Sequence, residues 1–194
     1  MKITESLTRI HAHLCGDGSI SFYKTSEKDR INRAQIEYSN KNPILLNNFR
    51  EDMRKEFGVK MTLRKDKEVI VKSIKLAMLI KENFGDLSSR KWRIPHIIKT
   101  SQIEIKLEWL KAFFEDEAYH EIKYNRLKIK SVNYNGLKDV QDILNSLRIV
   151  SKITGPNCDG SWYLTIPKFS SIDLLSTFKK EQARKGTFKK SFCL

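Results

Sequence analysis

Two spacings of apolar residues run along this chain, one typical of strands and one typical of helices. Residues 19–25 alternate between polar and apolar side chains, which predicts a half-buried strand. After Asn42-Pro43, apolar residues recur every three or four positions up to Gly58, which predicts a helix. The same reasoning predicts strands at 34–39, 59–64 and 68–72 and a further helix at 74–84.

The second half of the chain repeats this order of elements. A linker with Pro95 is expected at 92–98. The elements predicted beyond it are strands at 121–123, 126–132, 150–154 and 161–166 and helices at 137–147 and 167–175. The chain therefore reads as an internal duplication.

Each half opens with a helix that ends at an acid, and the two helices match at an offset of 100 residues. The matched pairs are Leu7 and Leu107, Ile10 and Leu110, Ala12 and Ala112, Leu14 and Phe114, and Asp17 and Glu117. Small residues such as Ala12 and Gly16, one turn apart, would let the two helices pack closely. Each acid would then lie at a helix C-terminus, where the helix dipole disfavours negative charge and a divalent cation would offset it.

These patterns predict an α+β fold built by pseudo-twofold duplication of an αββαββα unit. Two antiparallel saddle-shaped sheets would be joined at a two-helix interface, with one face of each sheet free. We expect an N-terminal repeat at 1–98, a C-terminal repeat at 99–178 and a basic tail at 179–194. The lysines and arginines of the tail could be solvated or could contact phosphate.

Charge adds a candidate ligand. The 194 residues carry 37 Lys and Arg against 23 Asp and Glu, and the net charge of +14 is divided as +8 in 1–98 and +6 in 99–194. Positive charge along both halves favours an extended polyanion, although a lysine-rich surface for solubility or heat tolerance has the same composition. Three cysteines without CxxC spacing favour neither a disulfide framework nor a zinc site. With no apolar run of membrane length and no signal peptide, we expect an intracellular protein that does not bind membranes.

The two motifs at 10–18 (IHAHLCGDG) and 110–118 (LKAFFEDEA) resemble those of the LAGLIDADG homing endonuclease family in its single-chain, two-motif form. The first motif keeps the usual Gly16-Asp17-Gly18 ending. The second departs from it, with Asp116 where a small residue is expected and Ala118 in place of glycine. Glu117 nevertheless retains an acid at the metal-binding position.

The resemblance implies a monomeric, site-specific endonuclease that cuts double-stranded DNA and acts in intron homing. Asp17 and Glu117 would be catalytic residues that bind Mg²⁺, or another divalent cation such as Mn²⁺, helped by the backbone carbonyls of Gly16 and Asp116. The metals would activate water and stabilise the leaving oxygen on the two strands, which would leave short 3′ overhangs. A turn-capping role for Asp17 is the alternative, but a cap does not require an acid in both repeats.

Two further residues are candidates for the active site. The family implies a basic residue near the scissile phosphate at His120 and a polar residue at Lys41, where His120 could orient water or stabilise developing charge. Both could instead be ordinary surface side chains. His11 and His13 replace apolar or small residues of the motif, and their i, i+2 spacing makes them a poor chelating pair.

Polar side chains on the expected strands form the candidate DNA-binding surface, because a two-stranded ribbon can enter the major groove and read base edges. These residues are Lys24, Gln35, Arg64, Arg126, Lys128, Lys130, Lys152 and Tyr163. A solvated strand face is the alternative for Arg126, Lys128 and Lys130.

Three functions stay open from sequence. The first is the endonuclease. The second is a nucleic-acid-binding protein on the same scaffold with weak or lost cleavage, such as an RNA-splicing maturase or a DNA-binding regulator, which the departures at Asp116 and Ala118 favour. The third is a nuclease directed by RNA or by nucleic-acid structure, with structured RNA as the partner.

Overall fold

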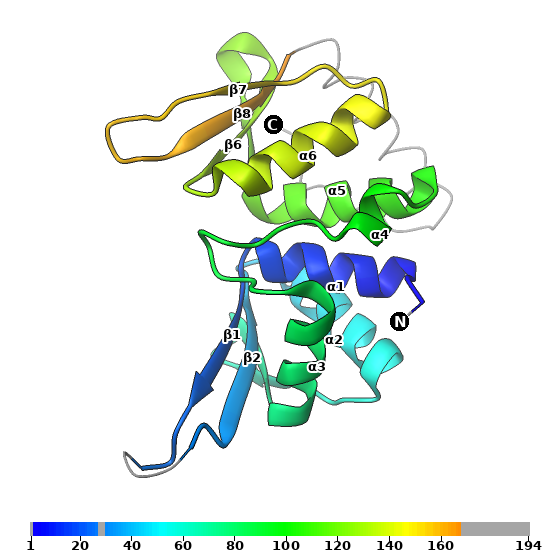
Figure 1. Cartoon of the computed structure of the whole chain (residues 1–194), viewed down its shortest axis with the longest axis vertical. Helices are drawn as coiled ribbons and strands as arrows, with labels where there is room; N and C mark the ends of the chain where they lie inside the picture. The colour runs from blue at the N-terminus through cyan, green and yellow to red at the C-terminus, as the bar shows by residue number, and fades with distance from the viewer. Residues whose placement is uncertain (1, 27–29, 168–194) are drawn as a thin grey trace.

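The computed structural model describes residues 2–26 and 30–167. The helix predicted at 167–175 and the basic tail lie outside the described residues, apart from Pro167. Figure 1 shows two helices side by side at the centre, with one repeat on each side of them. The elements of the first repeat are α1 (Glu5–Cys15), β1 (Gly18–Tyr23), β2 (Arg33–Ser39), α2 (Pro43–Phe57), β3 (Thr62–Arg64), β4 (Glu68–Lys72) and α3 (Ile74–Phe84).

Helix caps explain why the elements of the first repeat closely match the predicted ones. The side chains of Thr4, Asn42 and Ser73 each accept a hydrogen bond from a backbone N–H in the first turn of the helix that follows. Helix α2 ends at Gly58, whose φ of 65° is the left-handed conformation that glycine adopts without strain. These local signals can be read directly from sequence.

The second repeat departs from prediction in three places. The linker contains one helical turn, α4 (His96–Lys99). The strand predicted at 121–123 instead spans Ala118–Glu121, so it begins three residues earlier and is one residue longer, and a 3₁₀ turn follows it. Helix α6 starts at Tyr134 instead of 137, because Asn133 caps it. The elements are α4 (His96–Lys99), α5 (Ile103–Glu117), β5 (Ala118–Glu121), the 3₁₀ turn η1 (Ile122–Tyr124), β6 (Arg126–Ser131), α6 (Tyr134–Ser146), β7 (Lys152–Thr154) and β8 (Trp162–Ile166).

Each repeat holds one four-stranded antiparallel sheet. The strand orders are β1-β2-β4-β3 and β5-β6-β8-β7, so the two sheets have the same topology. In β2, Ala34, Ile36 and Tyr38 are buried while Gln35 and Glu37 face the other side. The predicted αββαββα order, with two antiparallel sheets and a two-helix interface, is confirmed through the last described strand.

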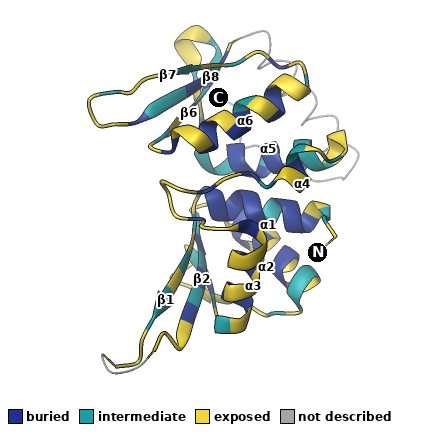
Figure 2. Cartoon of the chain, viewed as in Figure 1, coloured by how far each residue is buried: buried dark blue, intermediate teal, exposed yellow. Residues whose placement is uncertain are grey.

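The two motif helices, α1 and α5, form the interface between the repeats, and both are lined with buried residues (Figure 2). Ala12 and Ala112 are buried there, as the predicted close packing requires. A charged cluster crosses the same interface, because Arg9 on α1 bonds both Asp52 of α2 and the buried Glu108 of α5. Since both acids pair with Arg9, their buried charge is compensated.

The linker is tied to the second repeat. Asp139 of α6 accepts hydrogen bonds from Arg93 and Lys99 side chains and from the backbone N–H of Ile94. Trp92 packs against Gly136, where an added Cβ would lie 2.5 Å from the indole ring. The predicted boundary at 98/99 therefore falls inside α4, within a segment that packs on the second repeat. No helix in the described ranges is long and apolar enough to cross a membrane.

Candidate functional site

The two motif acids lie where the two motif helices end. Helix α1 ends at the Gly16 cap, and Asp17 follows it before β1 begins. Glu117 is the last residue of α5 and directly precedes β5. Since α1 and α5 pack together, the structure brings one carboxylate from each repeat to the junction of the two sheets.

The carboxylates of Asp17 and Glu117 form an electrostatically unfavourable pair. Burial raises the pKa of Glu117 to about 7, and the negative charges of Asp17 and Asp116 act in the same direction. Desolvation, followed by the charge of Asp116, raises the pKa of Asp17 to about 6, although the Asp17 side chain stays open to solvent and Asn40 donates a hydrogen bond to it. Like charges held together at helix C-termini are unfavourable without a cation.

The donor set fits a hard divalent cation that takes its other ligands from water and from the substrate. Mg²⁺ is usually held by one or two carboxylates together with waters and substrate phosphates. Asp17 and Glu117 supply such a pair, and the backbone carbonyls of Gly16 and Asp116 adjoin them in the chain. In the described part of the chain, no group of three or more His, Cys, Asp or Glu could hold a metal ion. Waters and substrate oxygens would therefore complete the coordination of an ion on this pair of acids.

The side chain of Asp116 is fully buried and occupied by hydrogen bonds. His13 Nδ1 lies 2.9 Å from its Oδ2, and the hydroxyl of Tyr38 donates to its Oδ1 at 2.7 Å. Asn40 Nδ2 lies 3.3 Å from Oδ1 and also donates to Asp17 Oδ2 at 3.0 Å. Tyr38 and Asn40 were not predicted from sequence, although Asn40 lies two residues before the helix cap Asn42.

His11 has a structural role in the core. It is fully buried, and its Nδ1 accepts a hydrogen bond of 2.9 Å from the indole of Trp109. Burial lowers the pKa of His11 to about 3, so the imidazole is neutral. It packs edge-on against Phe84, whereas His13 contacts Tyr38, Phe49 and Asp116. The two histidines therefore face different neighbours, as their spacing predicts.

Lys41 and His120 lie less favourably for catalysis. Lys41 is exposed beside Asn40, and within the described part of the chain it forms no side-chain hydrogen bond or ion pair. Register pairs His120 with Leu127, so its side chain leaves β5 on the side opposite Lys128 and bonds Asn125 at 2.8 Å. Tyr119, which pairs with Lys128, shares the face of Lys128 instead. The catalytic role of His120 stays a prediction.

Four of the five predicted side chains in the second repeat are cations on one free sheet face. Register pairs Lys128 with Thr165, Lys130 with Tyr163, and Lys152 with Thr165. Their orientation is held by local contacts: Arg126 pairs with Glu121, Lys130 with Asp159, and Lys128 lies 4.4 Å from the centre of the Tyr163 ring. The five residues that share this face are Arg126, Lys128, Lys130, Lys152 and Tyr163. The structure thus brings these five side chains together on one face. Their role in binding DNA stays a prediction.

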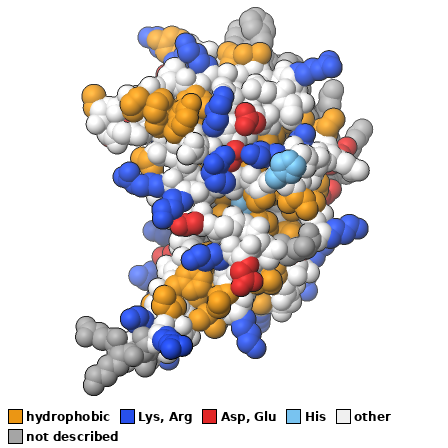
Figure 3. Space-filling model, in the orientation of Figure 1, with side chains coloured by type: hydrophobic (Ala, Val, Ile, Leu, Met, Phe, Trp, Pro, Cys, Tyr) orange, Lys and Arg blue, Asp and Glu red, His pale blue; other side chains and the backbone are white. Residues whose placement is uncertain are grey.

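The first sheet presents a more mixed face. Gln35 lies on the free side of β2, and Arg64 shares that side through its pairing with Glu68, which in turn pairs with Ser39. Lys24 is exposed just beyond β1. Figure 3 shows Lys and Arg along the strand side of the molecule, on the left of the view, with others on the helical side.

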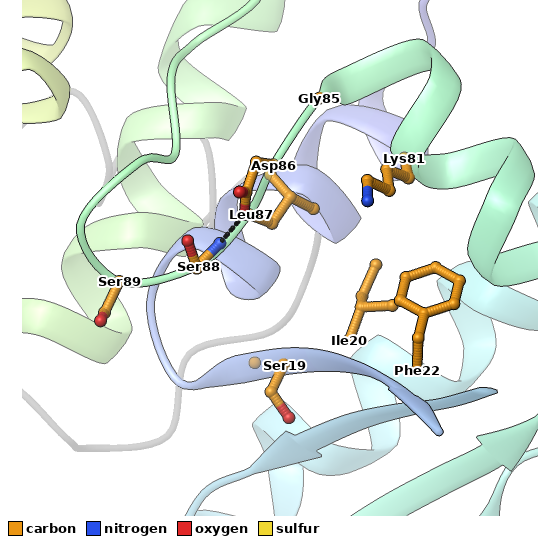
Figure 4. Close-up of a pocket in the computed structure, with 10 residues that line it drawn as sticks. Ser19, Ile20, Phe22, Lys81, Gly85, Asp86, Leu87, Ser88 and Ser89 are labelled. Atoms are coloured by element: carbon orange, nitrogen blue, oxygen red, sulfur yellow. Dashed lines mark hydrogen bonds between the residues drawn. The ribbon is translucent and has the colours of Figure 1, made fainter. Parts of the chain in front are cut away.

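A hollow of about 350 Å³ lies beside the site, on the helix-facing side of β1 (Figure 4). Ile20, Phe22 and Leu87 contribute apolar side chains to it, and Lys81 and Asp86 contribute charged ones. Lys81 lies 5.2 Å from the centre of the Phe22 ring. Neither Asp17 nor Glu117 lines this hollow, so it is separate from the carboxylate pair.

No protein-family model and no curated protein matches the sequence. Solved structures do match the fold. The crystal structure of I-DmoI in complex with DNA and Mn has a TM-score of 0.65 at 20% identity, covering 88% of this chain and 96% of that one. Mesophilic variants of the homing endonuclease I-DmoI give a TM-score of 0.66 at 20% identity, with coverage of 89% and 96%.

The N-terminal LAGLIDADG domain of DUF199/WhiA also matches, with a TM-score of 0.54 at 13% identity, covering 97% of this chain and 84% of that domain. A variant of I-DmoI has further been solved with its target DNA in the presence of Mg, and I-DmoI with DNA and Ca. At these identities the likeness establishes the fold. The chain has the LAGLIDADG fold of I-DmoI, as its two motifs predicted.

Proposed function

We propose that this protein is a site-specific endonuclease that cuts double-stranded DNA with the help of a divalent metal ion. The observation that carries the proposal is the position of Asp17 and Glu117, one from each repeat, at the junction of two sheets whose free faces carry cations. A duplex lying along both sheets would have its two strands at the two acids. The fold shared with I-DmoI, which was solved with target DNA, supports the same conclusion.

Side chains of the protein would bind the DNA, orient it and neutralise part of its negative charge. Lys128, Lys130 and Lys152 would contact phosphate or guanine edges, and Gln35 suits the edge of adenine. Asp17 and Glu117 would hold Mg²⁺ or Mn²⁺ with their carboxylates and the adjoining backbone carbonyls. Such an ion would lower the pKa of a bound water and stabilise the leaving oxygen. Lys41 stays a candidate at the edge of the site, whereas the position of His120 gives its catalytic role no support.

The test is cleavage of a defined duplex. The DNA segments that flank the reading frame are joined into one duplex, which reconstructs an uninterrupted insertion site, and this duplex is incubated with protein and Mg²⁺. We expect one double-strand cut with short 3′ overhangs, which no longer forms when EDTA is added. The double variant Asp17→Asn/Glu117→Gln is the matched control, since it keeps the size of both side chains and should bind without cutting.

A second function has a specific observation behind it. Asp116 fills the space beside Gly16, and its buried side chain is engaged by His13, Tyr38 and Asn40. Such a site could serve a nucleic-acid-binding protein without cleavage, and the fold match to the WhiA domain fits that alternative. Tight, salt-sensitive binding of the duplex without any cut at any divalent metal concentration would favour it. Preference for structured RNA over the duplex would indicate an RNA partner.

A further inference from the structure

Asp116 occupies a position that is complementary to Gly16 across the helix interface. A Cβ added at Gly16 would lie 2.8 Å from Asp116 Cβ and 2.9 Å from Asp116 Oδ2. The space that glycine leaves on α1 is therefore filled by the aspartate of α5. A buried carboxylate is costly unless hydrogen bonds compensate its charge, and here each hydrogen bond to it from the described residues comes from the other repeat.

The donors to Asp116 come from two different parts of the first repeat. His13 lies on α1, while Tyr38 ends the buried face of β2 and Asn40 follows that strand. Together they occupy both carboxylate oxygens, Oδ2 by His13 and Oδ1 by Tyr38 and Asn40. With both oxygens engaged, the Asp116 side chain is poorly placed to be a metal ligand, and its contacts instead join the repeats beside the paired acids.

Asn40 connects this buried carboxylate to the exposed one. Its Oδ1 accepts a hydrogen bond of 2.9 Å from the backbone N–H of Asn42, which determines the orientation of the amide. The Nδ2 group must then face the acids, and it lies 3.0 Å from Asp17 Oδ2 and 3.3 Å from Asp116 Oδ1. An NH₂ group has two hydrogens, so one can bond each carboxylate.

We infer that Asn40, anchored on the buried Asp116–His13 pair, is a positioning residue that holds the Asp17 carboxylate in its metal-binding orientation. This inference rests on the proposed function for the role of Asp17. Asp116 of the second motif would then help to orient Asp17 of the first motif, through Asn40. His13 and Asp116, both departures from the family's usual motif, would be explained as one coupled pair.

One test measures Mn²⁺ binding to the metal-free protein by calorimetry. A second test titrates Mg²⁺ in single-turnover cleavage experiments. Asn40→Leu keeps the approximate size of the side chain and removes the donor without adding charge, and Asn40→Ala removes the side chain. We expect both to raise the half-saturating metal concentration about tenfold or more, and to change the rate at saturating Mg²⁺ by less than about threefold. Asp116→Ala should give the same split.

Asn42→Ala is the matched control. It removes the side-chain cap of α2 but keeps the backbone N–H that orients Asn40, so metal affinity should not change. A double-mutant cycle of His13→Ala and Asp116→Ala measures the interaction between the two side chains. The stability of each variant is obtained from its urea midpoint without metal. The double variant should lose less stability than the sum of the single variants.

The outcomes separate the two proposals. Unchanged metal affinity in the Asn40 variants, or an equal loss of rate at every Mg²⁺ concentration, would overturn the positioning role while the endonuclease function stands. A wild-type protein that binds Mn²⁺ but cuts no DNA would contradict the proposed function, and a shift in Mn²⁺ affinity would still support the role of Asn40. A wild-type protein that binds no Mn²⁺, either alone or with duplex DNA, would overturn both.

Discussion

Gly16 and Asp116 fit each other across the helix interface so closely that a methyl group on Gly16 would lie 2.8 Å from Asp116 Cβ. Gly16→Ala should therefore overpack the interface and lower the free energy of unfolding by about 1–3 kcal/mol. Urea denaturation without metal measures this loss.

Removing the Asp116 side chain should lower the loss of stability that the added methyl group causes. In the double variant Gly16→Ala/Asp116→Ala, the added methyl group no longer meets a carboxylate, so its cost should fall well below that of Gly16→Ala alone. If the methyl group costs as much in the Asp116→Ala background as in the wild type, the contact between these positions is not what constrains Gly16.

The sequence predicted the first repeat better than the second because its signals are local. Ser73 caps α3 and Gly85 ends it, and the strand β4 lies between a turn and that cap. Helix α4 lacks such signals: its Pro95 cap makes no side-chain hydrogen bond, and the segment is held by contacts with Asp139, about 40 residues away. Periodicity cannot reveal a single turn that depends on tertiary contacts.

The candidate site likewise has some features that sequence reveals and others that depend on the fold. The acids and the alternating cations could be found because repeat matching and strand periodicity are properties of the sequence. The bond between His13 and Asp116 joins residues 103 positions apart, and Asn40 acts through geometry that depends on the fold. The sheet face of His120 could not be assigned from sequence, because the predicted strand at 121–123 began after this residue.

Glu117→Gln should stabilise the metal-free protein at alkaline pH. The pKa of Glu117 is raised from 4.5 to about 7 in the folded state, so its destabilising charge is absent below pH 4.5 and fully present above pH 7. The variant should be more stable than wild type by about 1–2 kcal/mol at pH 8, after allowance for solvent screening, and no more stable at pH 4. Urea midpoints across this range provide the measurement, and an equal effect at both pH values would contradict the assignment.

Divalent metal should reverse that pH dependence. Mg²⁺ binds the folded, ionised site, so it should raise the melting temperature of the wild type more at pH 8 than at pH 5.5. Glu117→Gln should lose most of this increase, and the exposed control Glu82→Gln, on the outer face of α3, should keep it. A melting temperature that rises equally in all three proteins would indicate nonspecific binding of Mg²⁺.

Cleavage should increase with pH through the same interval. Protons compete with metal for Glu117, whose pKa is about 7, and for Asp17, whose pKa is about 6. At subsaturating Mg²⁺ the single-turnover rate should therefore rise steeply from pH 5.5 to 7.5, and at saturating Mg²⁺ the curve should shift to lower pH. A curve that does not move with Mg²⁺ would mean that these protons do not compete with the metal.

Binding should weaken steeply with salt, and the cations of the second sheet should account for part of this dependence. On duplex DNA the logarithm of affinity falls with the logarithm of salt by about 0.9 for each phosphate neutralised. Replacing Lys128 and Lys130 together by Ala should make the slope shallower by about one or two units. The control replaces Lys55 and Lys75, which are exposed on α2 and α3. If Lys128 and Lys130 contact phosphate, replacing them should weaken binding to all DNA sequences alike. If they read bases, the replacement should relax sequence specificity. An unchanged slope in the first pair, or an equal change in the control, would leave the face of β6 as an ordinary solvated surface.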